Sequence, residues 1–221
     1  MRLTALILSL LLACQAAHAG PWPREKGTYF ISAGGNFLLS DGAQLPVYYD
    51  PTLYLEYGVQ QRLKIGLDMH TADAARIGTV FVFATVPLGD LDARHKFAAS
   101  FALGMRVNTL GETENLIRGG LSWGIGLDHG WVSVDASATK GSKDPLFRPK
   151  ADITYGRHWG DDWTTTLQLQ TGQGFTSDYY AKIVPSVTYN LRDNLKLTLG
   201  SVHALTGDRG TGMKFETWLT F

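Results

Sequence analysis

The chain has 221 residues, with 20 Lys and Arg against 20 Asp and Glu, so its formal net charge is zero. This balance argues against a nucleic-acid binder, which normally carries a basic excess or a basic stripe. Charged residues are scarce at 18%, aromatic residues reach 11% and Gly is frequent with 25 copies, a composition that favours a β-rich protein over a disordered one.

Residues 1–19 have the pattern of a secretory signal peptide. Arg2 is followed by the apolar stretch 3–13, and an Ala-His-Ala sequence ends at Ala19. We expect signal peptidase I to cut after Ala19, which leaves residues 20–26 as a periplasmic N-terminal segment. The apolar stretch is shorter than the about 18 residues that a membrane-spanning helix needs, and no later run reaches that length.

Lipidation at Cys14 is the alternative to this cut, because residues 11–14 resemble a bacterial lipobox. Under the cut after Ala19 the mature chain contains no Cys. That outcome excludes disulfides, thiol chemistry and Cys-ligated metals.

The rest of the chain, 27–221, reads as hairpins in which apolar and polar residues alternate. No helical period stands out. We predict twelve strands, at 27–38, 51–58, 63–71, 77–88, 95–107, 115–127, 131–140, 150–158, 163–171, 181–190, 195–205 and 212–221. Run 77–88 is apolar on both faces, so its orientation stays open.

A soluble β-sandwich would alternate in the same way. The connections favour a membrane barrel instead, because the predicted short ones (58–62, 89–94, 128–130, 160–162 and 191–194) alternate with mostly longer ones. Outer-membrane barrels have short periplasmic turns, longer external loops and an even number of strands. We therefore predict an all-β, 12-stranded antiparallel transmembrane barrel over 27–221, located in the cell outer membrane, with both mature termini at the periplasmic end.

Aromatic residues gather at the run ends, as in the girdles at the two membrane interfaces. At the periplasmic interface we expect Tyr57, Trp159, Trp163, Tyr189 and Phe221. The last run ends on Phe221 with apolar residues at every second position, which resembles the C-terminal signature of Gram-negative outer membrane barrels. That resemblance implies recognition by the barrel assembly machinery through the C-terminal strand.

The whole pattern is similar to small-solute outer membrane transporters of the aromatic-degradation (MetA-pathway) type. The start Pro21-Trp22-Pro23-Arg24 also resembles proteobacterial outer membrane proteins. The resemblance implies a porin-like transport function with outer membrane lipid and a small solute as partners. It fixes neither the solute nor the oligomeric state.

A twelve-stranded barrel lies between closed eight-stranded barrels and open sixteen-stranded porins, so we expect a narrow polar lumen. Parity places these charged residues inside: Glu56, Lys64, Asp68, Arg106, Arg118, Asp135, Lys150, Asp152, Lys182, Lys196, Lys214 and Glu216. These are 5 acids and 7 bases, which predicts passive passage with a mild preference for anions. The turn at 58–62 predicts that Glu56 lies opposite Lys64 and Tyr57 opposite Leu63.

Two alternatives to a channel stay open. One is a closed barrel with a structural or adhesive role, its lumen filled by Trp131, Trp218, Phe81 and Phe83. The other is a lipid-modifying hydrolase with Ser201 and His203, which share the outer face but lack an obvious acid or amide to orient the histidine. We expect no cofactor and no metal site, because the His residues are scattered and the Gly-rich stretches lack a phosphate-loop ending.

Overall fold

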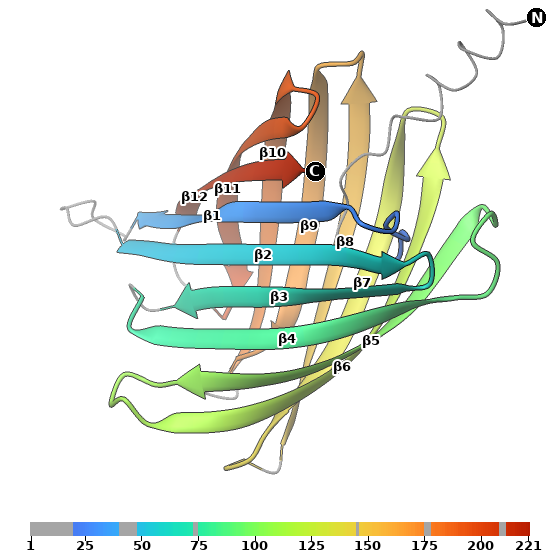
Figure 1. Ribbon diagram of the computed structural model, residues 1–221. Coiled ribbons are helices and arrows are strands. Elements are labelled where there is room, and N and C mark those ends of the chain that lie inside the picture. Colours follow the sequence, from blue (N-terminus) through green and yellow to red (C-terminus); the bar gives the residue numbers. More distant parts are fainter. Residues whose placement is uncertain (1–19, 40–47, 73–74, 145, 175–177, 208–210) are drawn as a thin grey trace, which may run out of the picture.

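The computed structural model describes residues 20–39, 48–72, 75–144, 146–174, 178–207 and 211–221. Each strand pairs antiparallel with the next in the chain, and β1 pairs with β12 to close a barrel (Figure 1). This confirms the predicted 12-stranded architecture. The expected signal peptide at 1–19, with the cut after Ala19 and the lipidation at Cys14, lies outside the described residues.

The strands are β1 (Tyr29–Leu39), β2 (Tyr48–Gln60), β3 (Leu63–Ala72), β4 (Ile77–Leu88), β5 (His95–Val107), β6 (Thr113–Leu127), β7 (Gly130–Gly141), β8 (Phe147–Trp159), β9 (Trp163–Gln173), β10 (Tyr179–Arg192), β11 (Leu195–Thr206) and β12 (Thr211–Thr220). The predicted bounds of β4 and β5 coincide with these. Most other strands are longer than predicted, because residues that flank each alternating run, polar and aromatic alike, continue the ladder.

The strand extensions weaken the loop asymmetry that favoured a membrane barrel in the sequence. The connections 61–62, 89–94, 128–129, 160–162 and 193–194 define what we call the short-turn end. Connection 89–94 is longer than connection 108–112 at the opposite, loop end. The C-terminus lies beside the start of β1 at the short-turn end (Figure 1), where Tyr29 and Phe221 exchange backbone hydrogen bonds of 2.9 and 3.1 Å.

Large apolar side chains cover the outer face of the barrel. Val82, Leu103 and Leu121 are 63%, 58% and 63% exposed, while Phe81 and Phe83 beside Val82 point inward and are buried. This arrangement settles the orientation of run 77–88. A soluble sandwich would bury such residues, whereas a membrane barrel presents them to lipid. The described residues contain no helix that is long and apolar enough to cross a membrane.

Aromatic pairs lie at both ends of the barrel. At the short-turn end Tyr29 packs on Tyr57 with ring centroids 4.5 Å apart, and Trp163 packs on Tyr189 at 4.7 Å. Trp159 lies opposite Trp163 in the ladder. At the loop end Phe37 stacks on Tyr49 at 4.6 Å.

The register between β2 and β3 differs from the predicted one. Gly58, not Glu56, lies opposite Lys64, and Tyr57 lies opposite Ile65. The reason is a bulge between Gly58 and Gln60, which lets β2 run on to a tight turn instead of ending before a longer loop. Because the shift is even, both charges stay on one face, and Glu56 reaches Lys64 diagonally at 2.7 Å.

Candidate functional site

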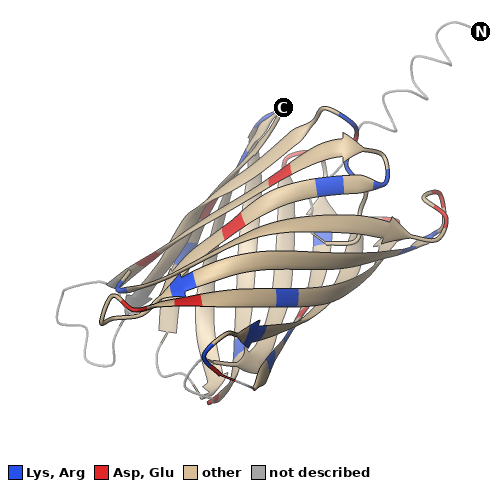
Figure 2. Cartoon of the chain, turned by 60° about the horizontal axis from the view of Figure 1, so that its bottom comes forward, with Lys and Arg blue, Asp and Glu red and all other residues tan. Residues whose placement is uncertain are grey.

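The inner face of the barrel can be followed from strand to strand through the register. Directly opposite residues share a face of the sheet, and the series Phe30, Glu56, Gly66, Phe83, Ala102, Arg118 runs from β1 to β6. Basic and acidic residues are interspersed along the strands (Figure 2). By this register all twelve charged residues assigned to the lumen from parity point inward.

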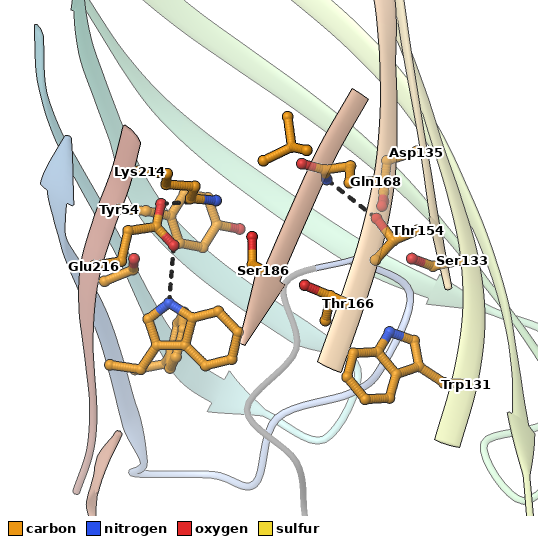
Figure 3. Close-up of a pocket in the computed structure, with 14 residues that line it drawn as sticks. Tyr54, Trp131, Ser133, Asp135, Thr154, Thr166, Gln168, Ser186, Lys214 and Glu216 are labelled. Atoms are coloured by element: carbon orange, nitrogen blue, oxygen red, sulfur yellow. Dashed lines mark hydrogen bonds and ion pairs between the residues drawn. The ribbon is translucent and has the colours of Figure 1, made fainter. Parts of the chain in front are cut away.

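A cavity of about 240 Å³ lies inside the barrel. Trp131 stands on one side of it, and Lys214, Glu216 and Tyr54 stand on the other (Figure 3). Between them the wall is made of hydroxyl and amide groups from Ser133, Thr154, Thr166, Gln168 and Ser186. A solute in this cavity would therefore meet hydrogen-bonding groups, aromatic faces and charges together.

One ion pair lines this cavity, and a second lies farther along the inner face. Lys214 Nζ lies 3.1 Å from Glu216 Oε1, and Glu216 Oε2 accepts a hydrogen bond of 3.2 Å from the Trp218 indole. Farther from the cavity lining, Lys150 pairs with Asp152 at 2.8 Å. Each pair joins residues two apart on one strand. The predicted alternation places such residues on the same face, so these pairs could be expected from the sequence alone.

Asp68 of β3 and Arg118 of β6 meet on the inner side of the wall formed by β4 and β5. Arg118 Nη1 donates to Asp68 Oδ2 at 2.7 Å, and the guanidinium lies 4.1 Å from the centroid of the Phe81 ring. Phe81 and Phe83 fill the wall beside them, where they pack with Ala102 and Leu116. One side of the lumen is thus closed by aromatic packing, while the cavity is lined by β7–β10, β12, β1 and β2.

The remaining basic residues are spread along the inner face. Arg106 lies opposite Thr79 and Glu114. Lys182 reaches over the Tyr180 ring at 5.4 Å, and Lys196 lies opposite Trp218. The register adds Asp50 and Glu114 to the inner acids and Lys96 and Arg148 to the inner bases, so the basic excess of two is unchanged.

The N-terminal segment, residues 20–26, lies against the inner face at the short-turn end. Pro21 is among the most deeply buried residues of the chain. Lys64 Nζ donates to the Gly20 carbonyl at 2.9 Å. The sequence pattern predicted only that this segment is periplasmic, and these contacts were missed. The one sequence feature that could have indicated these contacts is Pro21-Trp22-Pro23-Arg24, which is more apolar than is usual for a solvent-exposed segment.

A buried carboxylate fastens the other end of the segment. Glu56 has a fully buried side chain, with Arg24 and Lys64 both 2.7 Å away. Its Oε1 also accepts a 2.7 Å hydrogen bond from the Tyr54 hydroxyl. Arg24 lies 5.0 Å from the centroid of the Phe30 ring. Two cations and the Tyr54 hydroxyl therefore compensate one desolvated carboxylate, as a buried charge requires.

Glycines let the segment approach the wall. A Cβ on Gly124 would lie 2.6 Å from Trp22 Cη2 and 2.8 Å from Pro21 Cγ. Gly126, two residues farther along β6, has no atom within 4 Å of the same position. Trp131 lies opposite Gly126 but packs over Gly156 on the other side. The indole leans toward β8 and leaves Gly126 uncovered.

Ser201 and His203 lie together on the outer face, near the loop end. His203 Nε2 is 3.1 Å from Ser201 Oγ, and the Thr211 hydroxyl is 3.5 Å from His203 Nδ1. Within the described part of the chain, no carboxylate or amide hydrogen-bonds His203. A serine–histidine contact is present, but among these residues the acid that would orient the imidazole in a catalytic triad is not.

The described residues contain no cluster of three His, Cys, Asp or Glu side chains that could hold a metal ion.

Solved outer membrane channels share this fold. The KdgM porin, solved in complex with disordered oligogalacturonate, superposes with a TM-score of 0.65 at 13% identity over 87% of this chain and 99% of that one. An outer membrane channel from Pseudomonas putida F1 gives 0.68 at 11% identity, covering 93% and 100%. The NanC porin gives 0.60 at 12% identity, covering 86% and 98%.

Neither family models nor curated sequences match the chain. The structural matches confirm the expected resemblance to outer membrane barrels at the level of the fold.

Proposed function

We propose that the chain is a passive outer membrane channel for small solutes. The observation that carries this is a closed barrel with an apolar, exposed outer face and a polar cavity inside. Lipid is the partner that fits the outer face, and a membrane location follows from the same exposure. The cavity is lined by Ser, Thr, Gln and paired charges. These polar groups can replace the water molecules that a hydrated solute loses as it enters.

The cavity lining favours small hydroxylated solutes, and the basic excess of the inner face favours those that carry a carboxylate or phosphate. Ser133, Thr154 and Ser186 offer hydroxyls, and Trp131 offers an aromatic face. Lys214 supplies a cation at the cavity wall, where it is paired with Glu216. The basic excess of the inner face adds a field that favours anions, because a narrow lumen with low-dielectric walls focuses it.

Liposome swelling tests this proposal. Proteoliposomes should swell in isotonic solutions of small neutral sugars, and faster with sugar acids of the same size. Lys214→Gln should reduce the advantage of the sugar acid, whereas Lys143→Gln, at an exposed connection of the loop end, should leave it unchanged. Swelling no faster than in protein-free liposomes would contradict the channel and favour a closed barrel with a structural or adhesive role.

The hydrolase alternative has one supporting observation, the Ser201–His203 contact of 3.1 Å. A serine nucleophile also needs an oriented base, and Thr211 is the one described group that contacts the other imidazole nitrogen. We expect detergent-solubilised protein to release no fatty acid from phospholipid beyond that released by Ser201→Ala. A serine-dependent release would revive the enzymatic alternative.

Assembly through the C-terminal strand is a further part of the proposal. Phe221 is 61% exposed at the short-turn end, beside the outward-facing alternation of Met213, Phe215 and Leu219. An exposed terminal aromatic residue of this kind is available to the barrel assembly machinery before the strand pairs with β1.

A further inference from the structure

Gly20 lies directly against a carboxylate inside the barrel. A Cβ built on Gly20 would be 3.2 Å from Asp135 Oδ1 and 3.4 Å from Asp135 Oδ2. The Gly20 nitrogen is bonded to the same Cα, which places it within about 6 Å of those oxygens. The Lys64 hydrogen bond to the Gly20 carbonyl holds this end of the segment in place.

Asp135 is one of two carboxylates that face each other on neighbouring strands. Asp135 of β7 is directly opposite Asp152 of β8, and like charges in such positions destabilise a sheet. Lys150 pairs with Asp152 Oδ2, while the buried Asp152 Oδ1 has no hydrogen-bond partner among the described residues. Ser122 hydrogen-bonds to Asp135, and Lys64 and Lys150 act on it from a longer distance, but no described Lys or Arg forms an ion pair with it.

The charge arrangement therefore favours one more cation beside Asp135, and the sequence offers one. Residues 17–19, Ala-His-Ala, immediately precede Gly20 in the pattern that a signal peptidase recognises. Hydrolysis there adds water across the Ala19–Gly20 peptide bond. Ala19 leaves with the new carboxylate, and Gly20 keeps the amine, which takes up a proton near neutral pH.

We propose that the chain is cut between Ala19 and Gly20 and that the new α-ammonium group of Gly20 forms an ion pair with Asp135 inside the barrel. The processed N-terminus is then the cation that balances the Asp135–Asp152 pair. It also fastens the free end of the segment whose other end is held by Arg24 and Glu56. This ion pair does not depend on the channel function, because a closed barrel would hold its N-terminus in the same way.

The first measurement is the intact mass of the full mature protein purified in detergent. We expect the mass of the chain that starts at Gly20. A lipidated chain starting at Cys14, or a start at any other residue, overturns the proposal, because no α-ammonium would then lie at Asp135.

The second measurement is the acylation rate of the N-terminal amine near neutral pH, followed on the tryptic peptide 20–24. Stabilisation of the ammonium by about 1.4 kcal/mol lowers the reactive, unprotonated fraction about tenfold. We expect Asp135→Asn to react about tenfold faster than the unmodified protein. The matched control is Glu216→Gln, which removes a carboxylate from the same cavity without touching Gly20 and should leave the rate unchanged.

A second variant covers the case in which Asp135→Asn does not fold. Two serines inserted between Ala19 and Gly20 move the amine by about 7 Å and leave the barrel sequence intact. This amine should also react about tenfold faster than that of Gly20 in the unmodified protein. An equal rate in the unmodified protein, Asp135→Asn and the insertion variant would overturn the proposal.

Discussion

Arg24 is the residue through which the N-terminal segment can be released most selectively. Arg24→Gln removes hydrogen bonds of 3.1 Å from Nε and 2.7 Å from Nη2 to Glu56 Oε2. Glu56 keeps Lys64 and the Tyr54 hydroxyl, each at 2.7 Å. Because the carboxylate stays compensated, we expect the barrel to remain folded while the segment loses its hold at this end.

The size of the effect follows from the hydrogen bonds that the substitution removes. A hydrogen bond to a charged group contributes about 1.5–3 kcal/mol, and every 1.4 kcal/mol is about a tenfold change in an equilibrium. Both bonds end on the same Glu56 oxygen and are counted as one interaction, so the ratio of docked to released segment should fall about 10- to 100-fold. Since the segment occupies part of the lumen at the short-turn end, release should appear as more frequent and longer visits to a higher-conductance level.

Single-channel recording in planar bilayers measures those visits. Lys26→Gln is the matched control, because it removes a cation from an exposed position of the same segment. We expect this variant to behave as the unmodified protein does. Identical level distributions in Arg24→Gln, Lys26→Gln and the unmodified protein would refute the reasoning.

Three further predictions concern selectivity, assembly and packing. Arg106→Gln with Arg118→Gln should shift the reversal potential toward cations, and more at low salt, because screening weakens there and the acidic partner of Arg118 is left uncompensated; an unchanged potential would count against a charged path. Deleting Phe221 should lower outer membrane levels, measured by fractionation, without reducing export across the inner membrane; normal levels would exclude this signal. Gly124→Val should raise conductance, because the valine side chain would collide with the N-terminal segment and displace it. Gly126→Val should leave conductance unchanged, and equal conductance in the two variants would argue against displacement of the segment.

The strand pattern could be predicted from the sequence because inside and outside differ in polarity at every second residue. In β5, for example, Phe97, Phe101 and Leu103 face outward while Ala98 and Ala102 face inward. That signal is local, so it survives without knowledge of the neighbouring strands. The alternation identifies the residues that face the lumen, but it does not predict which of them contact one another.

Contacts between distant segments could not be predicted in this way. The bulge after Gly58 shifted the pairing of β2 with β3, since one extra residue at a turn leaves no mark on the alternation. Run 77–88 gave no orientation because Val82 and Phe83 are equally apolar, and only the wall formed with Ala102 and Leu116 decides which faces inward.

The docking of the N-terminal segment was also beyond the sequence pattern. Residues 20–26 have no strand alternation, and Arg24 alone gives no sign that its partner is Glu56, 32 residues away. The need for a glycine at position 124 becomes clear only from the structure, in which Trp22 packs against it. The sequence pattern thus predicts the strands but not the packing of this irregular segment against distant strands.

The measurement that tests the central claim most directly is single-channel conductance of the full mature protein in a planar lipid bilayer with a salt gradient. We expect discrete current steps whose reversal potential has the sign of a mild anion preference. Folding of the same sample is checked by its heat-dependent mobility in a detergent gel. Folded protein that gives no steps, or steps with cation preference, would contradict a passive channel with a basic lumen.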